Sequence, residues 1–176
     1  MPECKDAQVL VLCEDRRHYH LVRGFLEEKG FKRITERKSP PGSGSAEQFV
    51  REQFPIELRA HRARARYANV LLIVCVDRDR GKQDRVAEFA QACVDRKMQP
   101  PADDDPLLVL IPARNIETWL YLVEHGPPVD ETTDYKPLCR AAKPGRLGRR
   151  LAADCSTINL SPSLVRARRD WRRLCG

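Results

Sequence analysis

Short apolar runs recur along this chain, and amphipathic stretches separate them. Runs rich in Val, Leu and Ile that end in polar residues are typical of strands buried on both faces. In a fourth stretch, apolar and polar residues alternate only weakly, which suits a short edge strand. The pattern predicts buried strands at residues 7–15, from Val70 onward and at 107–112, and the edge strand at 31–38.

The stretches between these runs have apolar residues at helical spacing. Pro55 interrupts the second of them, and because proline lacks a backbone N–H, two shorter helices are expected there. Helices are predicted at residues 19–30, 46–68, 84–98 and 115–126. Strands that alternate with helices indicate βαβ units, so the expected fold is a Rossmann-like α/β fold with a mostly parallel sheet flanked by helices.

The pattern changes after Gly126, where the chain becomes rich in proline and basic residues. The last residues again look helical, with Ser161 as a cap and Pro162 at the first helical position. Leu164 and Trp171 would face inward. We therefore expect an α/β domain at residues 1–126 and a basic, mostly helical extension at 127–176 packed on it.

Composition adds limits. With 176 residues, 41% hydrophobic and 32% charged, the chain suits a globular protein with a real core. It has no run of about 20 apolar residues and no apolar signal segment at its start, so a cytoplasmic protein without a membrane span is expected. The seven cysteines form no C-x-x-C pair, which disfavours a structural zinc site and favours reduced thiols.

The formal net charge of +7 favours a polyanionic partner such as nucleic acid, although charge also serves solubility. An aromatic content of 6% disfavours single-strand binding by extended base stacking. Basic residues are dense in the C-terminal helix, where they form either a solvated face or a surface that contacts phosphates. These are Arg166, Arg169, Arg172 and Arg173.

Carboxylates follow three of the predicted strands. Glu14 ends the first, Asp77 and Asp79 end the run from Val70, and Glu117 comes one helical turn after the third. The carboxyl ends of parallel strands share one edge of the sheet, where open α/β sheets usually bind ligands, so all four side chains can converge. Oxygen ligands suit Mg²⁺ or Mn²⁺, and such an ion can neutralise a phosphoryl group and activate water.

In these positions the chain resembles the TOPRIM domain shared by topoisomerases, primases and OLD-family nucleases. Glu14 after the first strand, the D-R-D of residues 77–79 and the I-E-T-W of residues 116–119 stand in the family's order. The last motif is similar to a helix of small stand-alone TOPRIM-like proteins encoded beside ATPases in bacterial defence loci. The resemblance covers roughly residues 7–125.

Two departures bear on the metal site. Asp15 stands where the family usually has glycine, and His18 stands where defence-type members often have a second acid. The first strand can therefore supply one good metal ligand and a poor second one, or an imidazole. His18 and His20 also form an H-x-H pattern that invites a zinc site, but two surface histidines at the start of a helix are commoner.

Structural explanations compete with each functional one. The four carboxylates can be helix caps or first-turn acids, which the helix dipole favours. Arg78 and Arg80 can neutralise the neighbouring aspartates or contact substrate phosphates. Lys82 and Arg114 are candidates for stabilising developing charge.

The preferred hypothesis is a Mg²⁺-dependent nuclease that cleaves DNA or RNA. The resemblance implies an effector of anti-phage defence with an ATPase partner, and the chain has no phosphate-binding G-x-x-x-x-G-K-[ST] loop of its own. The alternative is a non-catalytic TOPRIM-like module that binds nucleic acid or a partner. A topoisomerase or primase is disfavoured, because no nucleophilic tyrosine domain fits in 176 residues.

Overall fold

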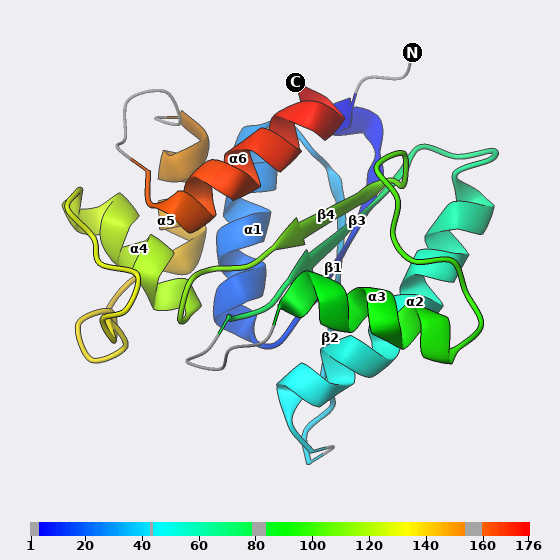
Figure 1. Cartoon of the computed structure of the whole chain (residues 1–176). Coiled ribbons are helices and arrows are strands. Elements are labelled where there is room, and N and C mark those ends of the chain that lie inside the picture. Colours follow the sequence, from blue (N-terminus) through cyan, green and yellow to red (C-terminus); the bar gives the residue numbers. More distant parts are fainter. Residues whose placement is uncertain (1–3, 43, 79–83, 154–159) are drawn as a thin grey trace.

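A computed structural model describes residues 4–42, 44–78, 84–153 and 160–176. Its centre is a four-stranded sheet with all neighbouring pairs parallel, in the order β2-β1-β3-β4 (Figure 1). The strands are β1 (Gln8–Cys13), β2 (Arg33–Lys38), β3 (Val70–Cys75) and β4 (Leu107–Leu110). The predicted α/β fold is confirmed, and the weakly alternating strand β2 lies at an edge, as expected.

Helices cover both faces of the sheet. They are α1 (Arg16–Glu28), α2 (Ala46–Arg64), α3 (Arg85–Asp95), α4 (Ile116–His125), α5 (Pro144–Ala153) and α6 (Pro162–Cys175), preceded by the short 3-10 helix η1 (Cys4–Asp6). One core contains Phe54 of α2 and Phe89 of α3. The other contains Leu21 of α1, Leu147 of α5 and Leu164 of α6. Figure 1 shows these two helical layers on opposite sides of the sheet.

The strand order creates a crevice at one edge of the sheet. The chain leaves β1 through α1 on one face, and it leaves the neighbouring strand β3 through α3 on the other face. Where adjacent strands send their connections to opposite faces, the carboxyl ends of the strands are left uncovered between them. The fold thus places a binding position between the ends of β1 and β3.

The expected break at Pro55 is wrong, because α2 runs unbroken from Ala46 to Arg64 with the proline inside it. A proline inside a helix costs about 3 kcal/mol through its missing hydrogen bond. Val50, Phe54 and Leu58 are fully buried on the same helix and pack against the sheet. We attribute the continuity of α2 to this burial, which offsets the missing bond.

Glycines allow α1 and α5 to pack with their backbones in contact. A Cβ atom added to Gly148 would overlap the backbone oxygen of Leu21, and one added to Gly24 would overlap the backbone oxygen of Gly145. Gly145 itself has room, because its added Cβ would lie 3.6 Å from the nearest backbone oxygen. This close crossing fixes α1, the helix that begins at the crevice.

The C-terminal segment contributes to the same core as the sheet. Tyr135, Leu147, Leu151 and Leu164 are buried in it. Helix α6 begins with Ser161 and Pro162, as the sequence predicts. In the described residues, no helix has the length and apolar character needed to cross a bilayer.

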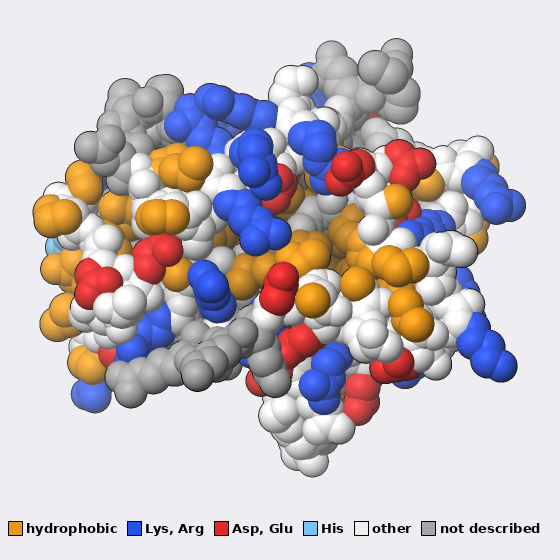
Figure 2. Space-filling model, viewed as in Figure 1, with side chains coloured by type: hydrophobic (Ala, Val, Ile, Leu, Met, Phe, Trp, Pro, Cys, Tyr) orange, Lys and Arg blue, Asp and Glu red, His pale blue; other side chains and the backbone are white. Residues whose placement is uncertain are grey.

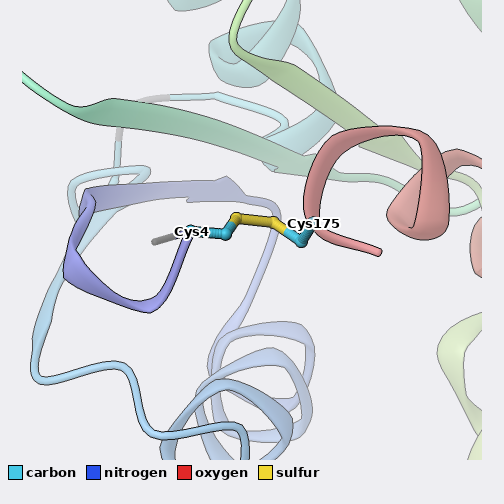
Figure 3. The surroundings of a disulfide bond; sticks show 2 residues. All are labelled: Cys4 and Cys175. Carbon is cyan, nitrogen blue, oxygen red and sulfur yellow. A yellow bond between two sulfur atoms is a disulfide. The ribbon is translucent and has the colours of Figure 1, made fainter. Parts of the chain in front are cut away.

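A disulfide joins Cys4 of η1 to Cys175 at the end of α6 (Figure 3). The expectation of reduced thiols is therefore wrong for this pair. The sequence could not reveal it, because 171 residues separate two cysteines that only the packing of α6 beside η1 brings together. Among the described residues, four cysteines are free and buried: Cys13, Cys75, Cys93 and Cys139. Cys155 lies outside the described residues.

Candidate metal centre

Glu14 and Asp77 meet at the crevice because their strands are in register. Cys13 at the end of β1 pairs with Cys75 at the end of β3, and the two acids follow these residues. The backbone N–H of Asp77 donates to Oε1 of Glu14 at 3.3 Å. Asp77 is buried, and Glu14 is half-buried. Two of the predicted carboxylates are thus brought together.

His18 completes the group from the first turn of α1. Ligand atoms of Glu14, His18 and Asp77 all lie within 4.8 Å of one another, so this cluster can hold a metal ion. The Nε2 atom of His18 lies 2.9 Å from Oδ1 of Asp77, and its Nδ1 atom lies 2.9 Å from Oδ1 of Asp15. The His18 side chain has no exposed surface.

Asp15 sets the geometry of this turn. Its carboxylate caps α1 by accepting hydrogen bonds from the backbone N–H groups of Arg17 at 2.7 Å and His18 at 3.2 Å. The same oxygen, Oδ1, lies against Nδ1 of His18. A carboxylate on one ring nitrogen fixes an imidazole and directs its other nitrogen, as is common for metal-binding histidines. The Nε2 atom thus points at Asp77.

The surrounding carboxylates favour a positive charge on His18. Burial alone would lower the pKa of the imidazole, but hydrogen bonds to Asp15 and Asp77 outweigh it and raise the pKa to about 10. Burial would likewise raise the pKa of Asp15, but the hydrogen bond from His18 outweighs it and lowers the pKa to about 2. The imidazolium therefore supplies the cation between the two acids, and metal binding through Nε2 must release its proton.

Arg85 supports the end of β3. Its Nε donates to the backbone oxygen of Asp77 at 3.1 Å, and its Nη1 contacts Glu47 and lies 2.9 Å from Oε2 of Glu88. The guanidinium is buried, which lowers its pKa, but the bonds to Glu47 and Glu88 outweigh this and raise the pKa above its usual range. Arg85 thus positions the backbone of Asp77.

Glu117 lies in the first turn of α4 but outside the group of three. Arg17 forms an ion pair with it, with 3.3 Å between Nε and Oε1, and Arg17 also donates to the backbone oxygen of Cys139 at 2.6 Å. Burial is the main cause that raises the pKa of Glu117, with a further contribution from the negative charge of Asp77. Its Oε2 is buried without a hydrogen-bond partner among the described residues. Glu117 therefore borders the site without joining it.

The other predicted residues divide into three groups. Asp79, Arg80 and Lys82 lie outside the described residues. Arg78 has an exposed side chain, and its backbone N–H bonds to the oxygen of Pro112 at 3.0 Å. Arg114 has a positive φ of 62° and directs its guanidinium to Asp134 at 3.6 Å.

No protein-family model, curated protein or solved structure matches this chain. The geometry of the site and the residue pattern are therefore the basis on which a function can be proposed.

The sequence did not identify Asp15 or the burial of His18. A surface position was expected for both histidines, which is wrong for His18 and correct for His20, whose side chain is exposed. The available signal was proximity, since His18 comes four residues after Glu14, in the first turn of the helix that follows the first strand. It agrees with the alternative that His18 supplies an imidazole ligand at the position where defence-type TOPRIM proteins often have an acid.

The basic residues of α6 lie on the surface. Arg166, Arg169, Arg172 and Arg173 are exposed, and Figure 2 shows Lys and Arg side chains gathered over α6. Arg166 and Arg169 lie 3.9 Å and 3.0 Å from Asp170, and Arg173 contacts the backbone oxygen of Asp103.

Proposed function

We propose that this chain is a metal-dependent phosphodiesterase that hydrolyses DNA or RNA. The convergence of Glu14, His18 and Asp77 at the crevice between β1 and β3 is the observation that carries the proposal. This is the position where α/β sheets bind their ligands. The positive net charge of +7 and the exposed arginines of α6 suit a nucleic-acid substrate.

Two carboxylates and one imidazole suit Mn²⁺ better than Mg²⁺. Mg²⁺ prefers oxygen ligands and retains its waters, whereas Mn²⁺ shares the preference for carboxylates but, as a transition metal, binds an imidazole nitrogen more readily than Mg²⁺ does. A bound ion at this site would neutralise a phosphodiester oxygen and lower the pKa of a bound water. We therefore propose Mn²⁺ as the preferred ion and Mg²⁺ as a weaker substitute.

The chain's own residues have distinct parts in this scheme. Glu14, His18 and Asp77 hold the ion, and Asp15 keeps the Nδ1–H of His18 directed away from it. Glu117 has a raised pKa and an unpartnered buried oxygen, so its carboxylate suits the acceptance of a proton from an attacking water. Arg78, exposed beside Asp77, suits a contact with a substrate phosphate.

The TOPRIM resemblance adds two elements to the proposal. It implies an ATPase partner, which would supply the nucleotide hydrolysis for which this chain carries no P-loop. It also implies a role as an effector of anti-phage defence.

A non-catalytic binding module is the second candidate. The observation that favours it is the pair of hydrogen bonds from His18 to Asp15 and Asp77, which places a positive charge between these two acids without any metal. A module of this kind would bind nucleic acid through α6 and leave it intact.

A cleavage assay separates the two candidates. Purified protein is incubated with plasmid DNA and with single-stranded RNA in Mn²⁺, Mg²⁺ or EDTA. The proposal predicts cleavage of one of these substrates that is fastest in Mn²⁺, absent in EDTA and lost in Asp77→Asn. Asp95→Asn is the matched control, because Asp95 is an exposed acid at the end of α3 that should not affect cleavage. Cleavage that persists in Asp77→Asn contradicts the proposal, and binding without cleavage supports the module.

A further inference from the structure

A cavity lies at the edge of the sheet opposite the candidate metal centre. It has a volume of about 650 Å³ and is lined by η1, which precedes β1, and by the C-terminal ends of α1, α5 and α6. Cavities of about 300–1,000 Å³ are typical of small-molecule sites. The end of α6 lies beside the start of the chain in Figure 1, away from the start of α1, where His18 lies.

The lining of this cavity is strongly basic. It includes Lys5, Lys29, Arg168 and Arg172, and no acidic side chain is among the described residues that line it. The side chains of Lys29 and Arg172 are exposed, so their charged ends can reach an anionic oxygen in the cavity.

Aromatic rings form another part of the wall. Trp171 packs edge-on against Phe25, with ring centroids 5.0 Å apart and planes at 90°, and it also contacts Phe31. Trp171 is half-buried, so part of its indole faces the cavity in a fixed orientation. The Nζ of Lys29 lies 5.9 Å from the ring centroid of Phe25, which places a positive charge beside the rings. A fixed indole is a good stacking surface for a planar ligand.

We propose that this cavity binds a mononucleotide, with its base against Trp171 and its phosphate among Arg168, Arg172 and Lys29. The two features of the lining match the two parts of such a ligand, an aromatic ring and a phosphate. A volume of about 650 Å³ suits a free nucleotide, and Arg166 and Arg169 of the same helix are exposed outside the lining. The proposal does not rest on the metal centre or on the proposed cleavage, although Arg172 also belongs to the basic surface of α6.

Fluorescence provides the test, because one of the two tryptophans lines the cavity. Trp119→Phe leaves Trp171 as the only reporter. Adenosine monophosphate, adenosine and inorganic phosphate are titrated separately in EDTA, so that no metal at the other edge can hold a phosphate. Adenosine monophosphate should quench Trp171 saturably, and each fragment should bind at least about tenfold more weakly because it makes only half of the contacts. Equilibrium dialysis with the unmodified chain checks that the reporter variant is representative.

Variants place the ligand. Arg172→Ala should weaken nucleotide binding by about tenfold or more, the loss expected for one charge-assisted contact. Arg169→Ala removes the same charge from the same helix outside the cavity and should change the affinity by less than about twofold. Asp77→Asn should bind as the unmodified chain does.

Three results would overturn the proposal. One is the absence of saturable binding of adenosine monophosphate by both methods. Another is an equal loss in Arg169→Ala and Arg172→Ala, which would indicate a diffuse electrostatic effect. The third is an unchanged affinity for adenosine monophosphate in Arg172→Ala, which would place the ligand outside this cavity.

Discussion

His18 has two states in the proposed mechanism. Without metal its ring is protonated and bridges Asp15 and Asp77, each at 2.9 Å. With metal the Nε2 atom must lose its proton and become a ligand, while the Nδ1–H remains on Asp15. The same contacts that orient the imidazole therefore compete with metal binding, and the identity of residue 18 should set both the strength and the selectivity of the site.

Replacing His18 with aspartate should change the metal preference. His18→Asp gives a set of ligands made only of oxygen atoms, which favours Mg²⁺ relative to Mn²⁺. We expect the ratio of the Mg²⁺ to the Mn²⁺ dissociation constant to fall by about tenfold, measured by titration calorimetry. His20→Asp, which alters an exposed histidine of the same helix, is the control and should leave the ratio unchanged. An unchanged ratio in His18→Asp would show that His18 is not a ligand.

At this scale the sequence predicted part of the site. Glu14 and Asp77 could be predicted because strand ends follow from apolar runs, and parallel strands place their ends at one edge. The role of His18 could not, because its burial depends on where α1 docks, which in turn depends on the Asp15 cap and on the α1–α5 contact. Glu117 was correctly predicted to lie in the first turn of α4. Its ion pair with Arg17, beside the cluster of Glu14, His18 and Asp77, was not predicted, because no local pattern encodes it.

At the scale of elements, the close crossing of α1 and α5 should limit which substitutions the chain tolerates. Gly148→Ala would force a Cβ into the backbone of Leu21, which cannot move as a flexible side chain can. We expect a loss of about 2–3 kcal/mol in the free energy of unfolding, measured with urea. Gly145→Ala lies three residues earlier with ordinary contact distances, so it should be neutral or stabilise by up to about 1 kcal/mol. Equal effects of the two substitutions would contradict a backbone-to-backbone crossing.

A buried ion pair between α2 and the segment before β4 should make stability depend on acid pH. Arg62 contacts both carboxylate oxygens of Asp105, at 2.7 and 2.6 Å. Burial would raise the pKa of Asp105, but the hydrogen bonds from Arg62 outweigh it and hold the pKa below the ordinary value of 3.8. The pair should therefore stabilise the fold fully above that value, and its contribution should disappear as the pH falls through the lower folded-state pKa.

Asp105→Asn tests this linkage. The variant should unfold more easily than the unmodified chain at pH 7, and the difference should shrink as the pH falls below about 3.8 through the lower folded-state pKa of Asp105. Thermal unfolding followed by circular dichroism across this range measures it. A difference that stays constant with pH would mean that Asp105 acts through packing alone.

Helix boundaries show where local rules fail. The segment between β2 and β3 was predicted to form two helices because Pro55 interrupts it, whereas the structure has a single helix there, α2. The prediction considered only the local cost of proline inside a helix, about 3 kcal/mol. The compensating burial of Val50, Phe54 and Leu58 depends on a sheet formed by distant segments. In contrast, the limits of α4 and α6 were predicted correctly, because Gly126 and Ser161–Pro162 mark them by their own backbone preferences.

At the scale of the whole molecule, the basic surface of α6 should make nucleic-acid binding sensitive to salt. Each arginine that contacts a phosphate releases condensed counterions, with a slope of about −0.9 per contact for duplex DNA. Replacing Arg166, Arg169, Arg172 and Arg173 together with Ala should reduce the salt slope by up to about 3–4, measured by fluorescence anisotropy. Circular dichroism should show an unchanged fold, since all four side chains are exposed. An unchanged slope would move the binding surface away from α6.

The overall architecture could be predicted further than its details. Alternating apolar runs and amphipathic helices were enough for the parallel α/β sheet. The strand order that opens the crevice between β1 and β3 was not predicted, since the local pattern does not say on which side of β1 each later strand pairs. The cavity beside Trp171 was also beyond prediction, because its walls come from both ends of the chain and from the ends of α1 and α5.

The most direct test of the metal centre is a crystal structure of the chain soaked in Mn²⁺, with data collected at a wavelength where manganese scatters anomalously. The proposal predicts one anomalous peak between the ends of β1 and β3, about 2.0–2.3 Å from Nε2 of His18 and from carboxylate oxygens of Glu14 and Asp77. Asp15 should still accept the Nδ1–H of His18 in that structure. A crystal in which this position holds no peak, and His18 remains bonded to Asp77, would contradict the account.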